Sequence, residues 1–474
     1  MGPLVRRALV GLLALGAAAF TLFAVRAGKA AVPSEPTARP LSTPIWSARR
    51  IPQPLVDATG TQRLQGRLDA ELAGVNTCVA VTDGDGERAL AAHNPDAALT
   101  PASSEKILTV VAALEVLGPD HRFDTKVVTP AGDLADGSVE RLWLVGSGDP
   151  VLATPEFAAE LAAEPFYEGS DVVTTSLAEL ADAVVAAGVR RVPGGIHGDD
   201  SRYEALRYLP TWRDTYRTEG QVGPLGALTV DDGFTVLNPQ PVPVDDPAVF
   251  AAAELTRLLA ERGVDMGGNP GRSVAPGDGA TVASVQSRPL RDIVGSLLRS
   301  SDNLTAELLV REVGVRASND GTTAAGTQAV VATLAGLGVT TDGLILVDGS
   351  GLDRGDRVSC NQLLAALDLG ERPELQALWE GLAVAGESGT LRGRFLGTPL
   401  QGRLRAKTGS LEGVTALVGV VDVGRPLRFA FLARGDFSEA DGVSLRERVA
   451  TIIAAFPEAP PGDALVPAPV PPGG

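Results

Sequence analysis

The chain has 474 residues, of which 44% are hydrophobic and 21% charged, and this composition is that of a globular protein. It is longer than one ordinary core requires, so two or three domains are expected. A net charge of −17 leaves little basic surface for phosphates, which argues against a nucleic-acid partner.

Residues 1–31 have the pattern of an export signal. Arg6 and Arg7 precede an uncharged run over 8–25, and small residues follow it. The run is long for a cleavable signal and just long enough to span a bilayer, so a signal peptide and a retained signal anchor both stay open. Either one predicts an extracytoplasmic protein, secreted or anchored to the cell membrane, and a retained segment would contact the membrane. The alternative is a buried N-terminal helix.

The two ends of the body predict an α/β fold with one shared sheet. After a Pro-rich linker over 32–60, a helical pattern runs from Gln62 to Ala73. CVAVTD and ERALAAH then form a plausible hairpin, and VTALVGVVDV and LRFAFLARG form a second one near the C-terminus, followed by a helix over 442–456. Strands at both ends with helices between them indicate a sheet assembled from the two termini.

The middle and the end of the chain differ from this body. Residues 120–285 are rich in Gly, Asp and Pro turns with short strand-like runs, which predicts one or two inserted domains. Residues 457–474 form a Pro-rich tail without a core-forming pattern, and we expect the tail to be disordered.

The stretch TPASSEKILTVVAALEVLGPD predicts a buried helix with a reactive start. Pro101 precedes the helix start, Ser103 lies in its first turn, and the body is almost wholly apolar up to Gly118 and Pro119, which end it. Ser103 and Lys106 are three residues apart and share one face. Only four of the 41 basic residues are lysines, and Lys, unlike Arg, can lose its proton. Ser103 is therefore a candidate nucleophile with Lys106 as its base; the alternative is a capping serine beside a solvated lysine.

Two further motifs follow in order along the chain. Ser301-Asp302-Asn303 lies between two helical patterns, where it could aim a hydroxyl and an amide into a cleft or merely break and cap helices. Lys407-Thr408-Gly409-Ser410 lies in a strand-like run, where the glycine would let a ligand or another backbone approach closely. Its alternative is an ordinary edge-strand lysine with a glycine bulge.

The ordered triple Ser-x-x-Lys, Ser-Asp-Asn and Lys-Thr-Gly is the signature of the penicillin-recognising serine enzymes. The 195 positions from Lys106 to Ser301 make the chain resemble the class C low-molecular-mass penicillin-binding proteins, the D-alanyl-D-alanine carboxypeptidase/endopeptidase family. LWLVGSGDPVL, GDDSRY, VDGSGLDRGDRVS and AGESGTLRGRF also look like that family, so the likeness covers about residues 75–455. TVDDG from Thr229 departs from it, since an asparagine-rich strand is expected there, and so does the acidic Glu105.

The resemblance implies a β-lactamase/transpeptidase-like domain over 61–119 and 286–456, an antiparallel sheet with a helical cluster, carrying a β-rich insertion over 120–285. It implies a serine-type D-Ala-D-Ala carboxypeptidase or endopeptidase that acts on peptidoglycan stem peptides through an acyl-enzyme and is inhibited by β-lactams. The implied catalytic residues are Ser103, Lys106, Ser301, Asn303 and Lys407, and the implied substrate-binding residues are Thr408, Gly409 and Ser410.

Each residue has an expected role. Lys407, in the same cleft, would lower the proton affinity of Lys106. Ser301 would relay a proton to the leaving amine, and Asn303 would hold the substrate amide and orient Lys106. Lys407, with the hydroxyls of Thr408 and Ser410, would recognise the substrate carboxylate. By analogy with the family, the backbone N–H groups at 103 and 410 would form the oxyanion hole.

No metal or other cofactor is expected, because the three histidines and two cysteines lack ligand spacing. Cys78 and Cys360 permit either one disulfide or two buried thiols. Glu371 and Glu374 superficially resemble a deacylating loop, but we interpret their segment as a surface turn. A β-lactam adduct should therefore be long-lived.

Three other functions remain as alternatives. A β-lactamase or esterase on the same scaffold would turn penicillin over quickly. A non-catalytic cell-wall-binding protein would show damaged motifs, whereas all three motifs are intact here. A Ser-His-Asp hydrolase is disfavoured because no Gly-x-Ser-x-Gly elbow occurs.

Overall fold

The computed structural model describes residues 53–84, 86, 88–130, 136–164, 167, 172–238 and 240–457. The predicted leader, most of the predicted linker and all of the tail except Pro457 lie outside these residues. Within the part of the chain that is described, no helix combines the length and apolar character needed to cross a membrane.

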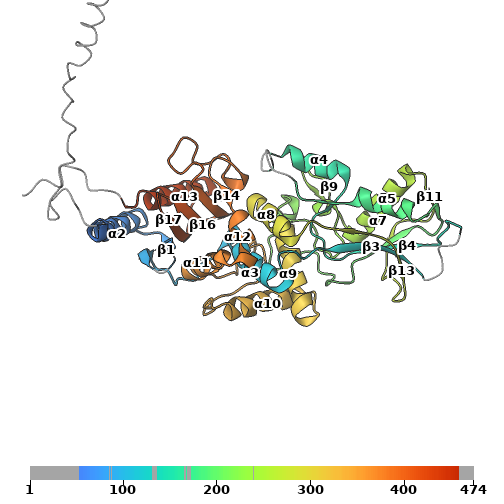
Figure 1. The fold of residues 1–474 in the computed structure, drawn as a ribbon, viewed down its shortest axis with the longest axis horizontal. Helices are drawn as coiled ribbons and strands as arrows, with labels where there is room; N and C mark the ends of the chain where they lie inside the picture. Colours follow the sequence, from blue (N-terminus) through green and yellow to red (C-terminus); the bar gives the residue numbers. More distant parts are fainter. Residues whose placement is uncertain are drawn as a thin grey trace, which may run out of the picture. The chain divides into compact units, whose positions relative to one another are not determined.

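A six-stranded antiparallel sheet joins the two ends of the chain, as predicted (Figure 1). Its strand order is β14-β15-β16-β17-β1-β2. The strands are β1 (Asn76–Asp83), β2 (Ala89–His93), β14 (Ala383–Val384), β15 (Leu404–Leu411), β16 (Val414–Asp422) and β17 (Pro426–Arg434). Val79 of β1 pairs with Phe431 of β17, which closes the sheet between segments some 350 residues apart. Both predicted hairpins are confirmed, as β1–β2 and β16–β17.

Alternate residues of the strands pack into two separate hydrophobic cores. On β17, Phe429 and Phe431 pack with α2 (Gln53–Glu71) and α13 (Glu439–Ala454). Ala430 and Leu432, which point to the opposite face, pack with the central helices. The sheet is therefore covered by helices on both faces.

Helix α2 begins at Gln53, earlier than the predicted start near Gln62. Gly60 argued against a helix in the sequence because glycine is a poor helix former. In the structure a side chain at Gly60 would lie 3.1 Å from Phe456, so the glycine permits close packing of the helix on the C-terminal segment.

Five helices pack together on the second face around the predicted apolar helix (Figure 1). They are α3 (Lys106–Leu117), α8 (Leu290–Ser300), α9 (Asn303–Ser318), α10 (Thr323–Gly336) and α11 (Cys360–Asp368). Helix α3 is buried from Lys106 through Leu114, as its apolar sequence predicts. It ends at Leu117, before Gly118 with φ of 88°. We refer to residues 61–119 and 286–456 as the catalytic body.

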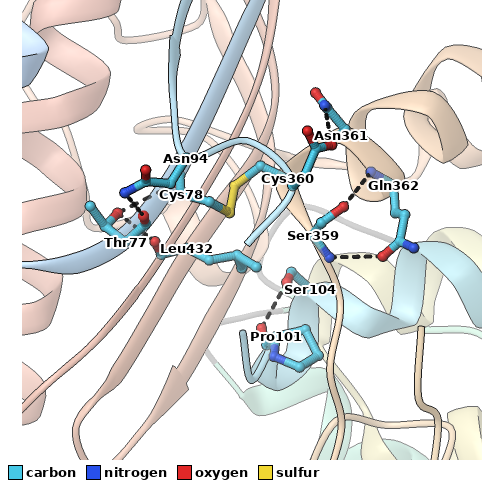
Figure 2. The surroundings of a disulfide bond; sticks show 11 residues. Thr77, Cys78, Asn94, Pro101, Ser104, Ser359, Cys360, Asn361, Gln362 and Leu432 are labelled. Carbon is cyan, nitrogen blue, oxygen red and sulfur yellow. Dashed lines mark hydrogen bonds between the residues drawn. A yellow bond between two sulfur atoms is a disulfide. The ribbon is translucent and has the colours of Figure 1, made fainter. Parts of the chain in front are cut away.

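Cys78 and Cys360 form a disulfide, which resolves the choice that the sequence left open (Figure 2). Cys78 lies in β1, and Cys360 is the first residue of α11. Ser359 and Gln362 cap α11 reciprocally, as Figure 2 shows. The bond thus ties the sheet to the helices that carry the site.

Residues 120–285, here called the inserted region, contain a second sheet of mixed direction in the order β12-β8-β4-β3-β13. Its strands are β3 (Asp124–Thr129), β4 (Leu142–Val145), β8 (Ile196–Asp199), β12 (Gly271–Arg272) and β13 (Ala280–Gln286). Helices α5 (Leu177–Ala186) and α7 (Pro247–Glu261) pack against it and form a core of their own.

The remaining elements are short. In the inserted region they are β5 (Leu152–Ala153), α4 (Pro155–Ala163), β6 (Thr175–Ser176), β7 (Arg191–Val192), α6 (Asp214–Thr218), η2 (Asp231–Gly233), β9 (Phe234–Val236), β10 (Val242–Pro243) and β11 (Asp265–Met266). In the catalytic body they are η1 (Ala102–Glu105), η3 (Leu369–Glu371), η4 (Pro373–Leu375), α12 (Ala377–Glu380) and η5 (Gly389–Leu391).

Candidate active site

Ser103 lies in a 3-10 turn, η1, directly ahead of α3 rather than in the first turn of the α-helix. Ala102 has φ of 48°, an uncommon value for a residue with a side chain. Gly351 packs so closely that a side chain there would lie 2.0 Å from the carbonyl oxygen of Ala102. The hydroxyl of Ser104 donates to the carbonyl of Pro101 at 2.7 Å. The turn is thus held from both sides.

Lys106 is fully buried below Ser103. Its Nζ donates to Ser103 Oγ at 2.9 Å, to Asn303 Oδ1 at 2.6 Å and to the carbonyl oxygen of Ser350 at 2.7 Å. Burial lowers the pKa of Lys106 to about 8, although nearby carboxylates, Asp348 first among them, act in the opposite direction. An appreciable fraction of Lys106 is therefore neutral near physiological pH.

The Ser-Asp-Asn motif covers the two-residue link between α8 and α9, Ser301 and Asp302, and the first residue of α9, Asn303. Ser301 has φ of 65°, a left-handed conformation that ends α8, and the side chain of Asp302 caps α9 by accepting from Thr305 N–H. These turns bring Asn303 to Lys106, and the Asn303 amide also donates to the carbonyl of Gln221 at 2.7 Å. The motif thus caps a helix and also presents an amide at the cleft, so both interpretations of the sequence hold.

Lys407 is also fully buried, in β15. Its Nζ donates to Ser301 Oγ at 2.8 Å and to the carbonyl oxygen of Thr408 at 2.9 Å. Burial, followed by the charges of Lys106 and Arg446, holds the pKa of Lys407 well below its usual value. The charge of Lys106 lowers the pKa of Lys407, as expected of two neighbouring ammonium groups, but burial is the largest effect on both lysines.

Strand β15 lies close against the Ser103 turn. A side chain at Gly409 would lie 2.8 Å from the carbonyl oxygen of Pro101, so only glycine allows this approach. Thr408 Oγ1 lies 3.0 Å from Thr390 Oγ1, and Ser410 Oγ accepts from Arg446 Nη1 at 2.8 Å.

These groups meet at a cleft of about 780 Å³. Of the predicted residues, Ser103, Ser301, Asn303, Thr408 and Ser410 line it. Lys106 and Lys407 lie buried behind them, and Gly409 forms the close contact described above.

Several cleft residues were missed in the sequence, namely Tyr167, Gln221, Asp232, Thr390, Arg394 and Arg446. They lie outside the three motifs, and only the tertiary fold brings them to the cleft. One of these residues, Asp232, belongs to TVDDG, the stretch that departs from the family pattern. The stretch forms the turn η2, which places Asp232 in the cleft wall.

Glu105 is buried beside Asp348 and Asp356, and one oxygen from each lies within 4.8 Å of the others. Neither oxygen of Glu105 accepts a hydrogen bond from an N–H or hydroxyl group of the described residues, and Oδ2 of Asp356 is likewise without such a donor. Burial raises the pKa of Glu105 well above its usual value and that of Asp356 to about 9. Asp348 is a poor metal ligand because its oxygens already accept from Trp212 and from backbone N–H groups. We interpret Glu105 and Asp356 as a pair that shares a proton.

Glu371 lies in the 3-10 turn η3, where its carboxylate contacts Arg428. Glu374 lies in the neighbouring turn η4. Neither residue is among those that line the cleft. The interpretation of this segment as a surface turn is consistent with these positions.

The serine, its buried lysine and the second serine–lysine pair have the arrangement of the penicillin-recognising serine enzymes. A family model described as the D-Ala-D-Ala carboxypeptidase 3 (S13) family matches residues 62–243 and 237–456. The chain therefore belongs to this family. The predicted family and the prediction of a serine-type peptidase are confirmed at this level.

Curated relatives support the assignment. The chain is 34% identical to a carboxypeptidase of Mycobacterium tuberculosis, over 71% of this chain and 72% of the relative. It is 29% identical to the D-alanyl-D-alanine carboxypeptidase of Actinomadura sp., over 88% of this chain and 90% of the relative.

A solved structure confirms the predicted fold. Penicillin binding protein 4 of Haemophilus influenzae matches with a TM-score of 0.70 at 22% identity. The match covers 82% of this chain and 99% of the other. The expected β-lactamase/transpeptidase-like fold is therefore present.

Proposed function

We propose that the chain is a D-Ala-D-Ala carboxypeptidase or endopeptidase that cleaves peptidoglycan stem peptides through an acyl-enzyme on Ser103. The observation that carries this proposal is the contact of Ser103 Oγ with the buried amine of Lys106, 2.9 Å apart. Family membership and the carboxypeptidase names of the relatives support the substrate class.

In the acylation step, neutral Lys106 takes the proton of the Ser103 hydroxyl as Oγ attacks the carbonyl carbon of the penultimate D-Ala. Asn303 holds Lys106 in place, because its Oδ1 accepts from Nζ. The backbone N–H groups of Ser103 and Ser410 are proposed to receive the developing oxyanion. This use of the N–H groups rests on the approach of β15 to the turn at Gly409.

Collapse of the tetrahedral intermediate breaks the peptide bond, and the departing amine must gain a proton. We propose that the proton that Lys106 took from Ser103 passes through Ser301 to the amine, which returns Lys106 to its neutral form; the support for this relay is that the Ser301 hydroxyl contacts Lys407 Nζ at 2.8 Å and can both donate and accept. Water then attacks the acyl ester and gives a proton to neutral Lys106, and Lys106 passes that proton to Ser103 Oγ as the ester breaks. The products are the shortened peptide and free D-Ala.

A β-lactam acylates Ser103 by the same attack, which opens its ring and leaves the amine tethered in the cleft. The described carboxylates that line the cleft are Glu164, Asp232, Asp302 and Glu439. None of them takes part in a hydrogen bond or ion pair with Ser103. We therefore expect slow deacylation, which favours a peptidase inhibited by β-lactams over a β-lactamase.

The location and domain plan are part of the proposal. A peptidoglycan substrate requires an extracytoplasmic protein, and residues 1–31 would supply a signal peptide or membrane anchor. We propose that residues 61–119 and 286–456 form the peptidase domain and that 120–285 form its insertion. The support for this division is that each part has its own sheet and core.

Intact-protein mass spectrometry with benzylpenicillin tests the proposal, together with release of D-Ala from a peptide ending in D-Ala-D-Ala. We expect a persistent adduct that maps to Ser103, and D-Ala release that is lost in Ser103→Ala. Rapid turnover of penicillin without a lasting adduct would favour the β-lactamase alternative. A folded chain that gives neither an adduct nor D-Ala would favour the binding-protein alternative.

A further inference from the structure

Arg446 is a buried cation at the edge of the cleft, and no role has been given to it above. It belongs to α13, its residue is only 6% exposed, and it is among the residues that line the cleft with Ser103 and Thr408. Among the described residues it forms no direct ion pair with a carboxylate, and the charges of Glu447 and Glu439 on the same helix act on it from farther away. A buried guanidinium without a contacting anion is costly, so an anion supplied by a ligand would compensate it.

The hydrogen bonds of Arg446 leave part of its guanidinium free. Nη1 donates to the carbonyl of Gly409 at 3.1 Å and to Ser410 Oγ at 2.8 Å. Nε and Nη2 have no hydrogen-bond partner among the described residues, and neither is fully enclosed. Because Ser410 Oγ accepts from Arg446, the Ser410 hydroxyl proton is free to point into the cleft.

The charges around Arg446 indicate which kind of ligand would bind there. Lys407 lies in the same strand as Ser410, and Arg394 also lines this side of the cleft. Burial, followed by the charge of Arg394, lowers the pKa of Arg446 to about 10, so Arg446 remains a cation at neutral pH. Arg394 and Arg446 favour an anion here, although the carboxylate of Glu439 also lines the cleft. A planar guanidinium fork matches a carboxylate better than a point charge does.

We infer that Arg446 binds the C-terminal carboxylate of the substrate, together with the Ser410 hydroxyl, and binds the carboxylate of β-lactams in the same way. This inference rests on the proposed function and deepens it. The positive charge that recognises the free carboxyl end comes from α13, a helix outside the three motifs. Arg446 thereby contributes to the selection of peptides that end in a free carboxylate over internal peptide bonds.

Paired ligands with and without a carboxylate charge test the inference. Acylation rates of Ser103 are compared for benzylpenicillin and its methyl ester, and for peptides ending in D-Ala-D-Ala and in the corresponding amide. In the unsubstituted protein we expect the free carboxylate to be preferred. Arg446→Gln should slow acylation by benzylpenicillin about tenfold to a hundredfold, the usual range for a charged hydrogen bond, and leave the rate with the ester nearly unchanged.

Two further variants separate recognition from structure. Arg446→Lys keeps the charge but loses the fork, so its carboxylate preference should be intermediate. Arg448→Gln is the matched control, because Arg448 lies on the same helix, is 54% exposed and pairs with Glu71. It should behave as the unsubstituted protein does.

The outcomes are distinct. If Arg446→Gln slows acylation by the acid and the ester equally, or changes neither rate, Arg446 does not recognise the carboxylate. The proposed function still stands in that case. If Arg446→Gln is acylated by neither ligand, the Arg446→Lys variant decides. A ratio of acid to ester acylation rates in that variant equal to the ratio in the unsubstituted protein overturns the inference. Absence of acylation in the unsubstituted protein overturns the proposed function and this inference together.

Discussion

Lys106 and Lys407 of the catalytic body differ from Arg257 and Arg262 of the inserted region in what surrounds their charge. Arg257 is 37% exposed and pairs with Glu261 at 2.7 Å, and the partly exposed Arg262 pairs with Asp182 at 2.6 Å. Pairs of this kind contribute little to stability and carry no chemistry.

The two lysines are fully buried and form no ion pair with a described carboxylate. Their partners are hydroxyl, amide and carbonyl oxygens, to which Lys106 and Lys407 donate. Such sites destabilise the charged amine and lower its pKa, and a reaction that needs a neutral amine benefits. Complete burial without a direct ion pair therefore distinguishes the two proposed catalytic lysines from these partly exposed arginines.

Lys106→Arg should give the largest effect. Arginine stays protonated, so it cannot take the Ser103 proton, and we expect acylation by benzylpenicillin to fall about a thousandfold or more. The rate of adduct formation measures this loss. Lys126→Arg is the matched control, since Lys126 is 45% exposed and pairs with Asp124. Acylation of Lys106→Arg at the normal rate would refute the assigned base.

Removal of the disulfide should give the next largest effect. Both cysteines of the chain lie in the catalytic body, and their bond joins β1 to α11. The double substitution Cys78→Ser and Cys360→Ser should lower the free energy of unfolding by about 2–5 kcal/mol. Denaturant titration measures this loss of stability. Adduct formation shows whether the variant is still folded. An unchanged midpoint in both the variant and the reduced protein would argue against a stabilising bond.

Glu105→Gln tests whether Glu105 and Asp356 share a proton. Their raised pKa values stabilise the fold at low pH, and this contribution is lost as the pH rises from about 4.5 toward 9. The amide of glutamine can donate to Asp356 at every pH. We expect the variant to lose less stability than the unsubstituted protein between pH 6 and 9, as measured by thermal unfolding. Parallel pH dependences would contradict the shared proton.

Arg257→Gln should give the smallest effect and sharpens the contrast with Lys106. The ion pairs of Arg257 are partly exposed, so we expect the free energy of unfolding to change by no more than about 1 kcal/mol. Acylation of Ser103 should be unaffected. A large loss of acylation would mean that the inserted region contributes to the chemistry through its ion pairs.

Sequence patterns with short-range causes predicted much of the fold. The apolar run from Lys106 to Leu117 indicated a buried helix, and alternation in the two hairpins indicated strands of one sheet. The start of α2 was misjudged because the close contact of Gly60 with Phe456 depends on the tertiary fold.

The candidate site divides in the same way. The three motifs identified the groups that meet at the cleft, because their spacing places reactive side chains at helix starts and on a strand. Arg446 and Asp232 could not be found by this route, since α13 and η2 reach the cleft only through packing of distant segments. The size of the burial effect on the lysine pKa values could not be predicted either, because complete burial depends on the whole surrounding core.

The pH dependence of Ser103 acylation tests the central claim most directly, namely that Lys106 acts as a neutral amine. With a pKa of about 8 for Lys106, the acylation rate with benzylpenicillin should rise between pH 6 and 9 with a midpoint near 8. A rate that stays constant or falls over this range would contradict the account, because the base would then not be an amine that loses its proton there.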